Sequence, residues 1–200
     1  MPVLGITGGV ATGKTSLSLE LRARLDAALF DADRCARDLL AGDSEVREEV
    51  ARHFGRGIFA ADGALDRAKL RECVFHDERE RAALEAILHP RIRARWLGLA
   101  GAARAAHRWL IVDIPLLFET GAEDHFDRII VAASSAGVQS RRLREIRALG
   151  EDVARGIIAA QLDLMFKIEK AHHVIWNDSA LSHLRDQAAL LAGYLLQAYG

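Results

Sequence analysis

The stretch GITGGVATGKTSL, residues 5–17, decides the fold of this chain. It holds four of the sixteen glycines and one of the four lysines of the 200-residue sequence. Residues 8–15, GGVATGKT, fit the pattern G-x-x-x-x-G-K-[ST], in which glycines let successive backbone N–H groups turn toward phosphate oxygens. The probability of a chance match at this composition is on the order of one in a thousand. The stretch therefore predicts a nucleotide-binding loop.

The residues on either side of the loop support this prediction. Residues 3–6 form an apolar run typical of a buried strand, and Leu17, Leu21 and Leu25 have the spacing of a helix that follows the loop. The start of that helix adds its positive end to the phosphate site. The alternative is a tight strand-to-helix turn without a ligand, but such a turn needs no lysine at this point.

In a loop of this kind, Lys14 reaches the β- and γ-phosphates of ATP and the hydroxyl of Thr15 binds Mg²⁺. Ala11 stands where many related loops have another glycine, which is tolerable if its φ angle is negative. The predicted nucleotide-binding residues are Gly8, Gly9, Val10, Ala11, Thr12, Gly13, Lys14, Thr15 and Ser16.

Short apolar runs predict four more strands, at residues 27–30, 109–115, 128–133 and 173–176. Helical patterns separate them, and Pro90 is expected to kink or restart a helix between the second and third strands. Strands that alternate with helices indicate an α/β fold with a parallel five-stranded sheet and helices on both faces. Helices are also expected at residues 139–149, 151–162 and 179–199.

The helical region between the second and third strands is too long for a simple crossover, so it is interpreted as an inserted subdomain. We expect three parts: a nucleotide-binding core of residues 1–33, 108–136 and 171–200, a helical insertion of residues 34–107, and a short helical lid of residues 137–170.

The composition limits the classes of protein and partner. Half of the residues are hydrophobic, which is enough for a sizeable core, and the net charge of −1 argues against nucleic-acid or membrane-surface binding. Two cysteines are too few for a disulfide framework, and the sequence has no Cys/His array with zinc spacing. With no apolar run of about 18 residues, we expect a cytoplasmic protein, with a monomer favoured.

Several carboxylates are candidates for the acceptor side of a phosphoryl transfer. Asp31 and Asp33 follow the second strand, where a carboxylate can orient an attacking hydroxyl, although Asp33 could equally be a helix N-cap. Asp113 ends the third strand, where it could hold Mg²⁺ directly or through water. Glu119 is either a second carboxylate near the acceptor or a surface charge.

A resemblance to a known family rests on ordered blocks of sequence. These are TGGVATGKT (7–15), DADRCARDLL (31–40), DGALDRAKLRECVF (62–75), LHPRIR (88–93), DIPLLFETG (113–121), QSRRL (139–143) and AAQLDLMFKIEKAHHVIWN (159–177). Through them the chain resembles the bacterial dephospho-CoA kinases, essentially from end to end. The first block is widespread among nucleotide-binding proteins, whereas DAD, HP and PLLFE are far more specific.

The resemblance implies that the chain uses ATP to phosphorylate the ribose 3′-hydroxyl of dephospho-CoA, the last step of coenzyme A synthesis. It implies that Asp33 acts at the acceptor hydroxyl, that Arg142 is a lid arginine and that Asn177 lies in the adenine-binding loop. The helical insertion matches the family's CoA domain. The substrate-binding residues that it implies are Asp33, Arg67, Leu70, Phe75, His89, Leu117 and Glu119.

Some positions depart from the family pattern. The second lid arginine usually falls four residues after the first, where this chain has Ile146, so Arg144 and Arg147 both stay candidates. The common Ala-Asp before the last strand is Ala171-His172 here, and Asn-x-Gly reads NDS at residues 177–179.

Two other functions remain as alternatives. The nearer one is another P-loop small-molecule kinase, for a nucleoside or a nucleoside monophosphate. The other is a regulatory ATPase switch, because the N-K-x-D motif of a GTPase does not occur.

Overall fold

The computed structural model describes residues 1–147 and 149–200, without the side chains of His76 and Arg147. The described chain forms two compact units, the first from residues 1–31 and 99–200 and the second from residues 32–98. The division that we predicted by function, into core, acceptor subdomain and lid, stays a prediction.

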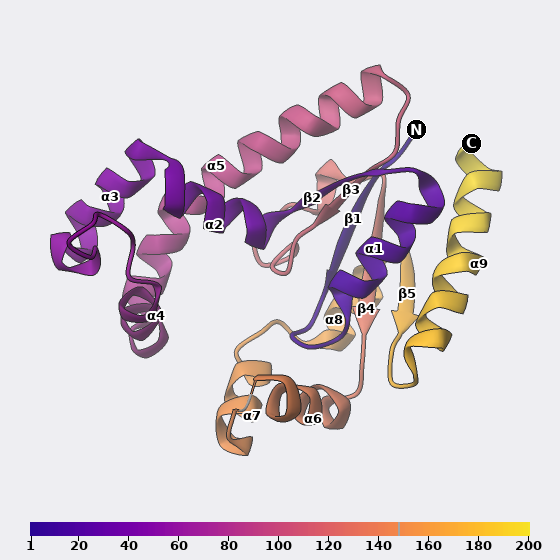
Figure 1. Cartoon of the computed structure of the whole chain (residues 1–200). Coiled ribbons are helices and arrows are strands. Elements are labelled where there is room, and N and C mark those ends of the chain that lie inside the picture. The colour runs from indigo at the N-terminus through magenta and orange to yellow at the C-terminus, as the bar shows by residue number, and fades with distance from the viewer. Residues whose placement is uncertain (148) are drawn as a thin grey trace. The chain divides into compact units, whose positions relative to one another are not determined.

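The first unit is built on five parallel strands in the order β2-β3-β1-β4-β5, which confirms the predicted fold class (Figure 1). The strands are β1 (Val3–Gly8), β2 (Ala28–Asp31), β3 (Leu110–Asp113), β4 (Arg128–Ala133) and β5 (His173–Trp176). In the register of the sheet, Asp113 lies opposite Ile6 on one side and Asp31 on the other. The loop after the central strand β1 therefore leaves the sheet beside two aspartates.

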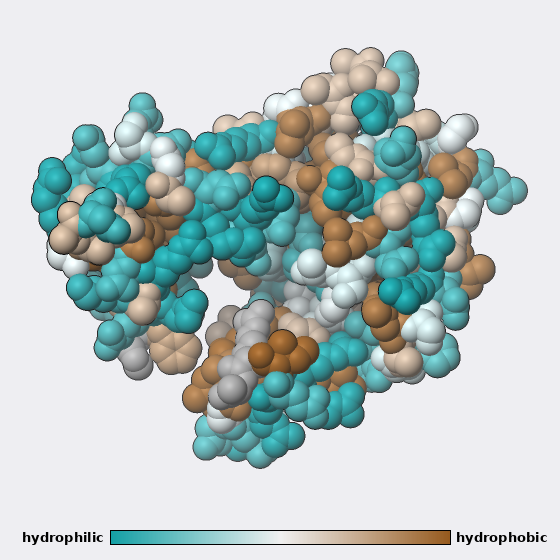
Figure 2. Space-filling view, in the orientation of Figure 1, coloured by the Kyte–Doolittle hydropathy of each residue, from teal (hydrophilic) through white to brown (hydrophobic). Residues whose placement is uncertain are grey.

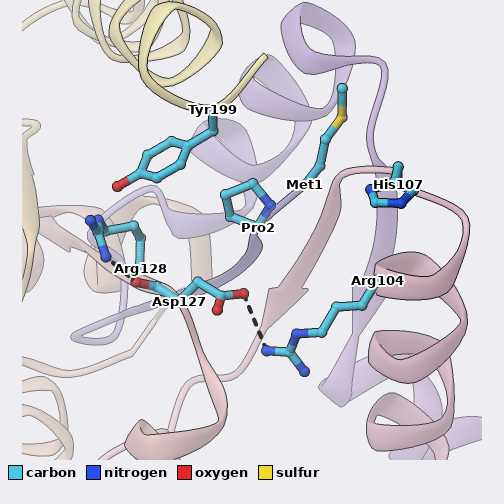
Figure 3. A pocket seen from close by; sticks show the side chains of 7 residues that line it. All are labelled: Met1, Pro2, Arg104, His107, Asp127, Arg128 and Tyr199. Atoms are coloured by element: carbon cyan, nitrogen blue, oxygen red, sulfur yellow. Dashed lines mark hydrogen bonds and ion pairs between the residues drawn. The ribbon is translucent and has the colours of Figure 1, made fainter.

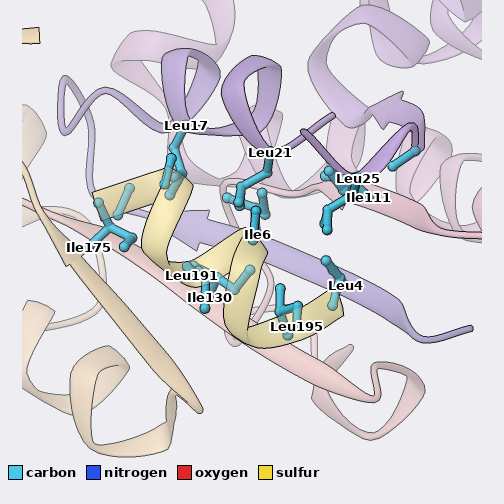
Figure 4. Close-up of a cluster of buried hydrophobic side chains, with 14 of the residues drawn as sticks. Leu4, Ile6, Leu17, Leu21, Leu25, Ile111, Ile130, Ile175, Leu191 and Leu195 are labelled. Carbon is cyan, nitrogen blue, oxygen red and sulfur yellow. The ribbon is translucent and has the colours of Figure 1, made fainter. Parts of the chain in front are cut away.

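One face of this sheet is covered by α1 (Lys14–Leu25) and α9 (Leu181–Tyr199). Leucines spaced by four on both helices pack with alternate residues of the strands, as Figure 4 shows for Leu17, Leu21, Leu191 and Leu195. Ile6 is among the strand residues that they bury. This packing fixes the axis of α1 and so the position of the loop from which it starts.

The other face is covered by the segment between β3 and β4, which includes the short η2 (Glu123–His125), and by α8 (Leu164–Lys170), which contacts β4. A Cβ atom added to Gly5 would lie 2.8 Å from side-chain atoms of both Leu117 and Phe126. Gly5 therefore lets this segment pack directly on the central strand.

A side chain of α9 hydrogen-bonds backbone groups of the edge strand β5. The side chain of Gln187 accepts a hydrogen bond from the Trp176 N–H at 3.2 Å and donates one to the Trp176 carbonyl at 2.9 Å. These backbone groups would otherwise be open to pairing with another strand.

Two helices, α6 (Ala136–Arg147) and α7 (Glu151–Ala159), pack together in the segment predicted as a lid. Apolar surface is visible on the molecule in Figure 2. Ile146 and Val153, on these two helices, are among the exposed apolar side chains. The helix predicted at residues 151–162 ends earlier, and α8 follows, which we did not predict. Asp163 begins α8 by accepting the N–H groups of Met165 and Phe166.

The second unit is helical. It contains α2 (Ala32–Gly42), α3 (Ser44–Phe54), η1 (Arg56–Ile58), α4 (Arg67–His76) and most of α5 (Glu78–Ala105). Asp43 and Asp66 cap α3 and α4 through their side chains. The expected restart at Pro90 is wrong, because α5 continues through this residue as one helix. None of the described helices combines the length and apolar character that a membrane crossing requires.

Candidate functional site

The loop between β1 and α1 needs its glycines for geometry. Gly13 has a φ angle of +87°, and a Cβ atom there would collide with the side-chain amide of Asn177. Gly8 has a φ angle of +154°, and its Cβ atom would collide with the carbonyl of Ala132. Gly13 precedes α1 without a side-chain cap, so the N–H groups of the first turn remain for a ligand of the loop.

Ala11 also lies in the left-handed region, with a φ angle of +58°. The condition that we set for tolerating an alanine here, a negative φ angle, is therefore not met. The left-handed conformation costs a residue with a Cβ atom about 1 kcal/mol. Other contacts of the loop must offset this cost.

Lys14 and Asp113 form an ion pair beside the loop. Ser18, one turn further along α1, donates a hydrogen bond to the second carboxylate oxygen of Asp113 at 2.9 Å. Burial raises the pKa of Asp113, while Lys14 and Ser18 act in the opposite direction. Thr15 is exposed in the same turn of the helix. Lys14, Thr15 and Asp113 thus lie together, as the sequence predicted, and Ser18 is a partner that it missed.

The guanidinium of Arg142 lies behind the loop. It donates to the carbonyl of Ala11 at 3.2 Å, to the hydroxyl of Ser134 at 3.2 Å and to the carbonyl of Asn177 at 2.9 Å. The side chain of Asn177 is buried and donates to the carbonyl of Thr12 at 2.8 Å. Both residues therefore support the loop, and their predicted contacts with the nucleotide stay predictions.

A second lid residue contacts the loop from the other end of the lid. The side-chain oxygen of Gln161 accepts the backbone N–H of Val10 at 2.7 Å. The residues are 151 positions apart, and no spacing in the sequence indicates that they meet. Of the two candidates for a second lid arginine, Arg144 lies 3.7 Å from Glu151, whereas the side chain of Arg147 is outside the described part.

Glu119 accepts a hydrogen bond from Lys167 of α8 at 2.6 Å. The side chain of Lys167 has no exposed surface, and that of Glu119 is 20% exposed. Leu117 is fully buried against Gly5, which favours a packing role over the predicted contact with substrate.

His172, just before β5, makes two hydrogen bonds to the backbone of Ile129 in β4. The ring Nδ1 of His172 accepts the backbone N–H of Ile129 at 3.0 Å, and the backbone N–H of His172 donates to the carbonyl of Ile129 at 2.9 Å. An aspartate, which the family pattern has here, would accept the same N–H through its carboxylate. Burial lowers the pKa of His172, and the charge of Arg128 lowers it further, which favours the neutral ring that can accept this N–H.

The remaining residues predicted for the acceptor all lie in the second unit. Asp33 is exposed in the first turn of α2, inside the helix and not at an N-cap. Arg67 begins α4 and is exposed, Leu70 is buried and Phe75 is 55% exposed. His89 is half-buried on α5. Their assignment to substrate binding stays a prediction.

A pocket in the first unit lies away from this loop. Its lining residues, shown in Figure 3, are Met1, Pro2, Arg104, His107, Asp127, Arg128 and Tyr199. Met1, Pro2, Asp127 and Arg128 lie at the amino-terminal ends of β1 and β4, whereas the phosphate loop leaves the carboxyl end of β1. Ligands of parallel sheets bind at carboxyl ends, and the pair formed by Arg104 and Asp127 crosses this pocket. It is therefore not the candidate site.

A glycine-rich loop from a central parallel strand, with a lysine at the start of the next helix and a carboxylate at the end of the neighbouring strand, defines a P-loop nucleotide-binding protein. The family model described as dephospho-CoA kinase matches residues 2–183. The chain belongs to the dephospho-CoA kinase family and is therefore a phosphotransferase.

Individual relatives agree with this assignment. The dephospho-CoA kinase of Hahella chejuensis is 36% identical over 195 residues, which cover 98% of this chain and 92% of that protein. A crystal structure from Thermus thermophilus matches with a TM-score of 0.75 and 29% identity, covering 96% of both chains. The dephospho-CoA kinase from Campylobacter jejuni matches in fold with a TM-score of 0.73 and 24% identity, covering 98% of both chains.

Proposed function

We propose that this chain transfers the γ-phosphoryl group of ATP to the ribose 3′-hydroxyl of dephospho-CoA, which gives coenzyme A and ADP. The observation that carries the proposal is the phosphate loop with Lys14 and Asp113 beside it, in a chain that matches the family over residues 2–183. The blocks that resemble the family extend through both compact units, so the acceptor side is part of the same match.

In the reaction that we propose, the triphosphate lies over the N–H groups of residues 11–16, and Lys14 leaves Asp113 to contact the β- and γ-phosphates. The bond between the γ-phosphorus and the bridging oxygen breaks, and a bond to the 3′-oxygen forms. Asp33 orients the 3′-hydroxyl and accepts its proton late, because the transition state is loose. Arg142 and the lid stabilise the transferring group and exclude water, which prevents hydrolysis of ATP.

Mg²⁺ fits the residues beside the loop. Thr15 offers an exposed hydroxyl, and Asp113 offers a carboxylate directly opposite Asp31 in the register of the sheet. Magnesium needs few protein ligands when it also binds phosphate oxygens. When bound, it would supply positive charge to the β- and γ-phosphates.

The proposal extends to the acceptor and the setting of the enzyme. Arg67, Phe75 and His89 are proposed to contact dephospho-CoA, with Glu119 on the side of the phosphate loop. Leu70 and Leu117 are proposed to shape the site from within the cores of their units. We further propose that Asn177 borders the adenine of ATP and that the enzyme acts in the cytoplasm as a monomer.

The test is to incubate the protein with ATP and Mg²⁺ and to measure ADP with dephospho-CoA, with a panel of nucleosides and nucleoside monophosphates, or with no acceptor. We expect turnover with dephospho-CoA, a product with one more phosphate at the 3′-position by NMR, and no turnover in the Lys14→Ala variant. Turnover with a nucleotide alone would favour another small-molecule kinase. Hydrolysis without any acceptor would favour the ATPase switch.

A further inference from the structure

Two residues of the lid segment contact the phosphate loop at neighbouring positions. Arg142, on α6, donates to the Ala11 carbonyl at 3.2 Å, and Gln161, which follows α7, accepts the Val10 N–H at 2.7 Å. The two contacts enclose the peptide that joins Val10 to Ala11. They are made by side chains nineteen positions apart, one within α6 and the other just after α7.

The peptide between them is the strained part of the loop. Ala11 is held at a φ angle of +58°, where a residue with a Cβ atom is disfavoured. Such a conformation persists only where surrounding contacts determine it. Val10 and Ala11 are each held on the backbone by one lid residue, so these contacts oppose the return of Ala11 to a negative φ angle.

The segment that follows Gln161 is anchored within the first unit. Asp163 caps α8 by accepting the N–H of Met165 at 2.6 Å, and Lys167, without exposed surface, donates to Glu119 at 2.6 Å. Gln161 therefore lies between two fixed points. Its oxygen accepts the N–H of Val10 in the loop after β1, and the segment that follows it is bonded to Glu119 in the loop after β3.

We propose that Gln161 is a positioning residue for phosphoryl transfer, which keeps the phosphate loop in its left-handed turn and links that turn to the lid. The inference rests on the proposed function. The side-chain oxygen of Gln161 accepts the N–H of Val10. Val10 precedes residues 11–16, whose N–H groups are proposed to hold the triphosphate, so this hydrogen bond can persist while ATP is bound. A change at Gln161 alters the loop on which ATP sits, without removing any group that contacts the acceptor.

The first test replaces Gln161 by methionine, which has a similar length but accepts hydrogen bonds only weakly, and by glutamate, which accepts the Val10 N–H fully. We expect Gln161→Met to lower kcat/KM for ATP about tenfold, a loss equivalent to about 1.4 kcal/mol, and to change KM for dephospho-CoA less than twofold. Gln161→Glu should recover most of the loss at high ionic strength, where its added charge is screened. The matched control is Gln197→Met, an exposed position on α9.

The second test is a double-mutant cycle with Ala11→Gly, which removes the strain that the Gln161 contact is proposed to offset. In the Ala11→Gly background, we expect Gln161→Met to lower kcat/KM for ATP at most threefold. An equal or larger loss in that background would overturn the proposal, as would a Gln161→Met variant with unchanged kcat/KM for ATP. A parallel loss for both substrates, in step with a lower Tm, would show a merely structural role.

Failure of this inference can be separated from failure of the proposed function. If the wild-type protein does not phosphorylate dephospho-CoA, the proposed function fails, yet the Kd for MgATP measured by calorimetry still compares Gln161→Met with the wild type. A weaker Kd that Ala11→Gly restores would support the role of Gln161 in the loop. An unchanged Kd for MgATP in Gln161→Met would exclude it.

Discussion

The ammonium group of Lys14 is paired with the carboxylate of Asp113, whose other oxygen accepts a hydrogen bond from Ser18 at 2.9 Å. The lysine that a triphosphate would need is thus held by the carboxylate at the end of the neighbouring strand. Because burial raises the pKa of Asp113 despite both partners, the ionised carboxylate is disfavoured at this position relative to water. Burial at this position therefore works against the negative charge of Asp113, which is retained beside Lys14.

We expect Asp113→Asn to leave the Tm of the nucleotide-free protein unchanged or slightly higher, while kcat falls at least 100-fold. A pKa raised above 3.8 means that the stability contributed by the neutral form is present below about pH 3.8 and is lost as the pH rises through the folded pKa. At pH 7 the neutral amide of the Asp113→Asn variant therefore avoids the desolvation cost of burying the ionised carboxylate. Calorimetric unfolding and the ADP assay measure the two effects, with the exposed Asp186→Asn as control. A Tm lowered by several degrees would contradict the argument.

Asp33→Asn should lower kcat about 100-fold, at the lower end for proton-transfer catalysis, because a loose transition state needs little assistance from a base. The Kd for MgATP should stay within twofold, since the variant keeps the phosphate loop. Asp38→Asn, at an exposed position of the same helix, is the matched control. Equal losses in turnover and ATP affinity would show instead that Asp33 maintains the structure.

The role of His172 predicts a dependence of stability on pH. Since its pKa is lowered from 6.5 by burial and by Arg128, its contribution to stability is present above pH 6.5 and is lost as the pH falls through the folded pKa. His173, whose pKa burial also lowers, adds to the same trend. We expect the Tm to fall between about pH 7 and pH 5, and His172→Asp to reduce that fall, because a carboxylate accepts the Ile129 N–H at both pH values.

The control for this experiment is His183→Asp, an exposed histidine on α9. The same pH slope in the wild type and in His172→Asp would mean that protonation at His172 does not weaken the contact between β4 and the residue before β5.

Lys167→Met should lower the free energy of unfolding by about 2 kcal/mol, which corresponds to a Tm lower by about 4–8 °C for a chain of this length. Removing the buried ammonium leaves the carboxylate of Glu119 without its partner, and at 20% exposure water compensates only in part. Lys170→Met, on the exposed side of the same helix, should change the Tm by less than about 2 °C. A double variant that also carries Glu119→Gln should recover part of the loss.

Much of the fold could be predicted because its signals are local. The apolar run at residues 3–6, the loop pattern and the leucines spaced by four in α1 each lie within a few residues. The five strands follow from equally short runs, and their alternation with helices indicates parallel pairing. The continuation of α5 through Pro90 was not predicted, because the local preference at a proline is to end or kink a helix.

The candidate site was predictable only where residue type and position along a strand carry the chemistry. Lys14, Thr15 and Asp113 fall in that group. The hydrogen bond that Gln161 accepts from the N–H of Val10 joins residues that are 151 positions apart. The hydrogen bond from Ser18 to Asp113 joins residues that are 95 positions apart. The φ angle of Ala11 was not predictable either, because the residues that oppose its preference come from the lid.

The order of the strands has a consequence for synthesis of the chain. β1 is made first and lies in the centre of the sheet, but its neighbours begin at Leu110 and Arg128, after the whole helical unit. At translation speeds of about 5–20 residues per second, the first strand waits roughly 5–20 s for a partner. During that interval the backbone N–H and C=O groups of the largely apolar strand β1 have no partner strand. A chaperone that binds nascent chains would therefore have a long-lived binding segment there.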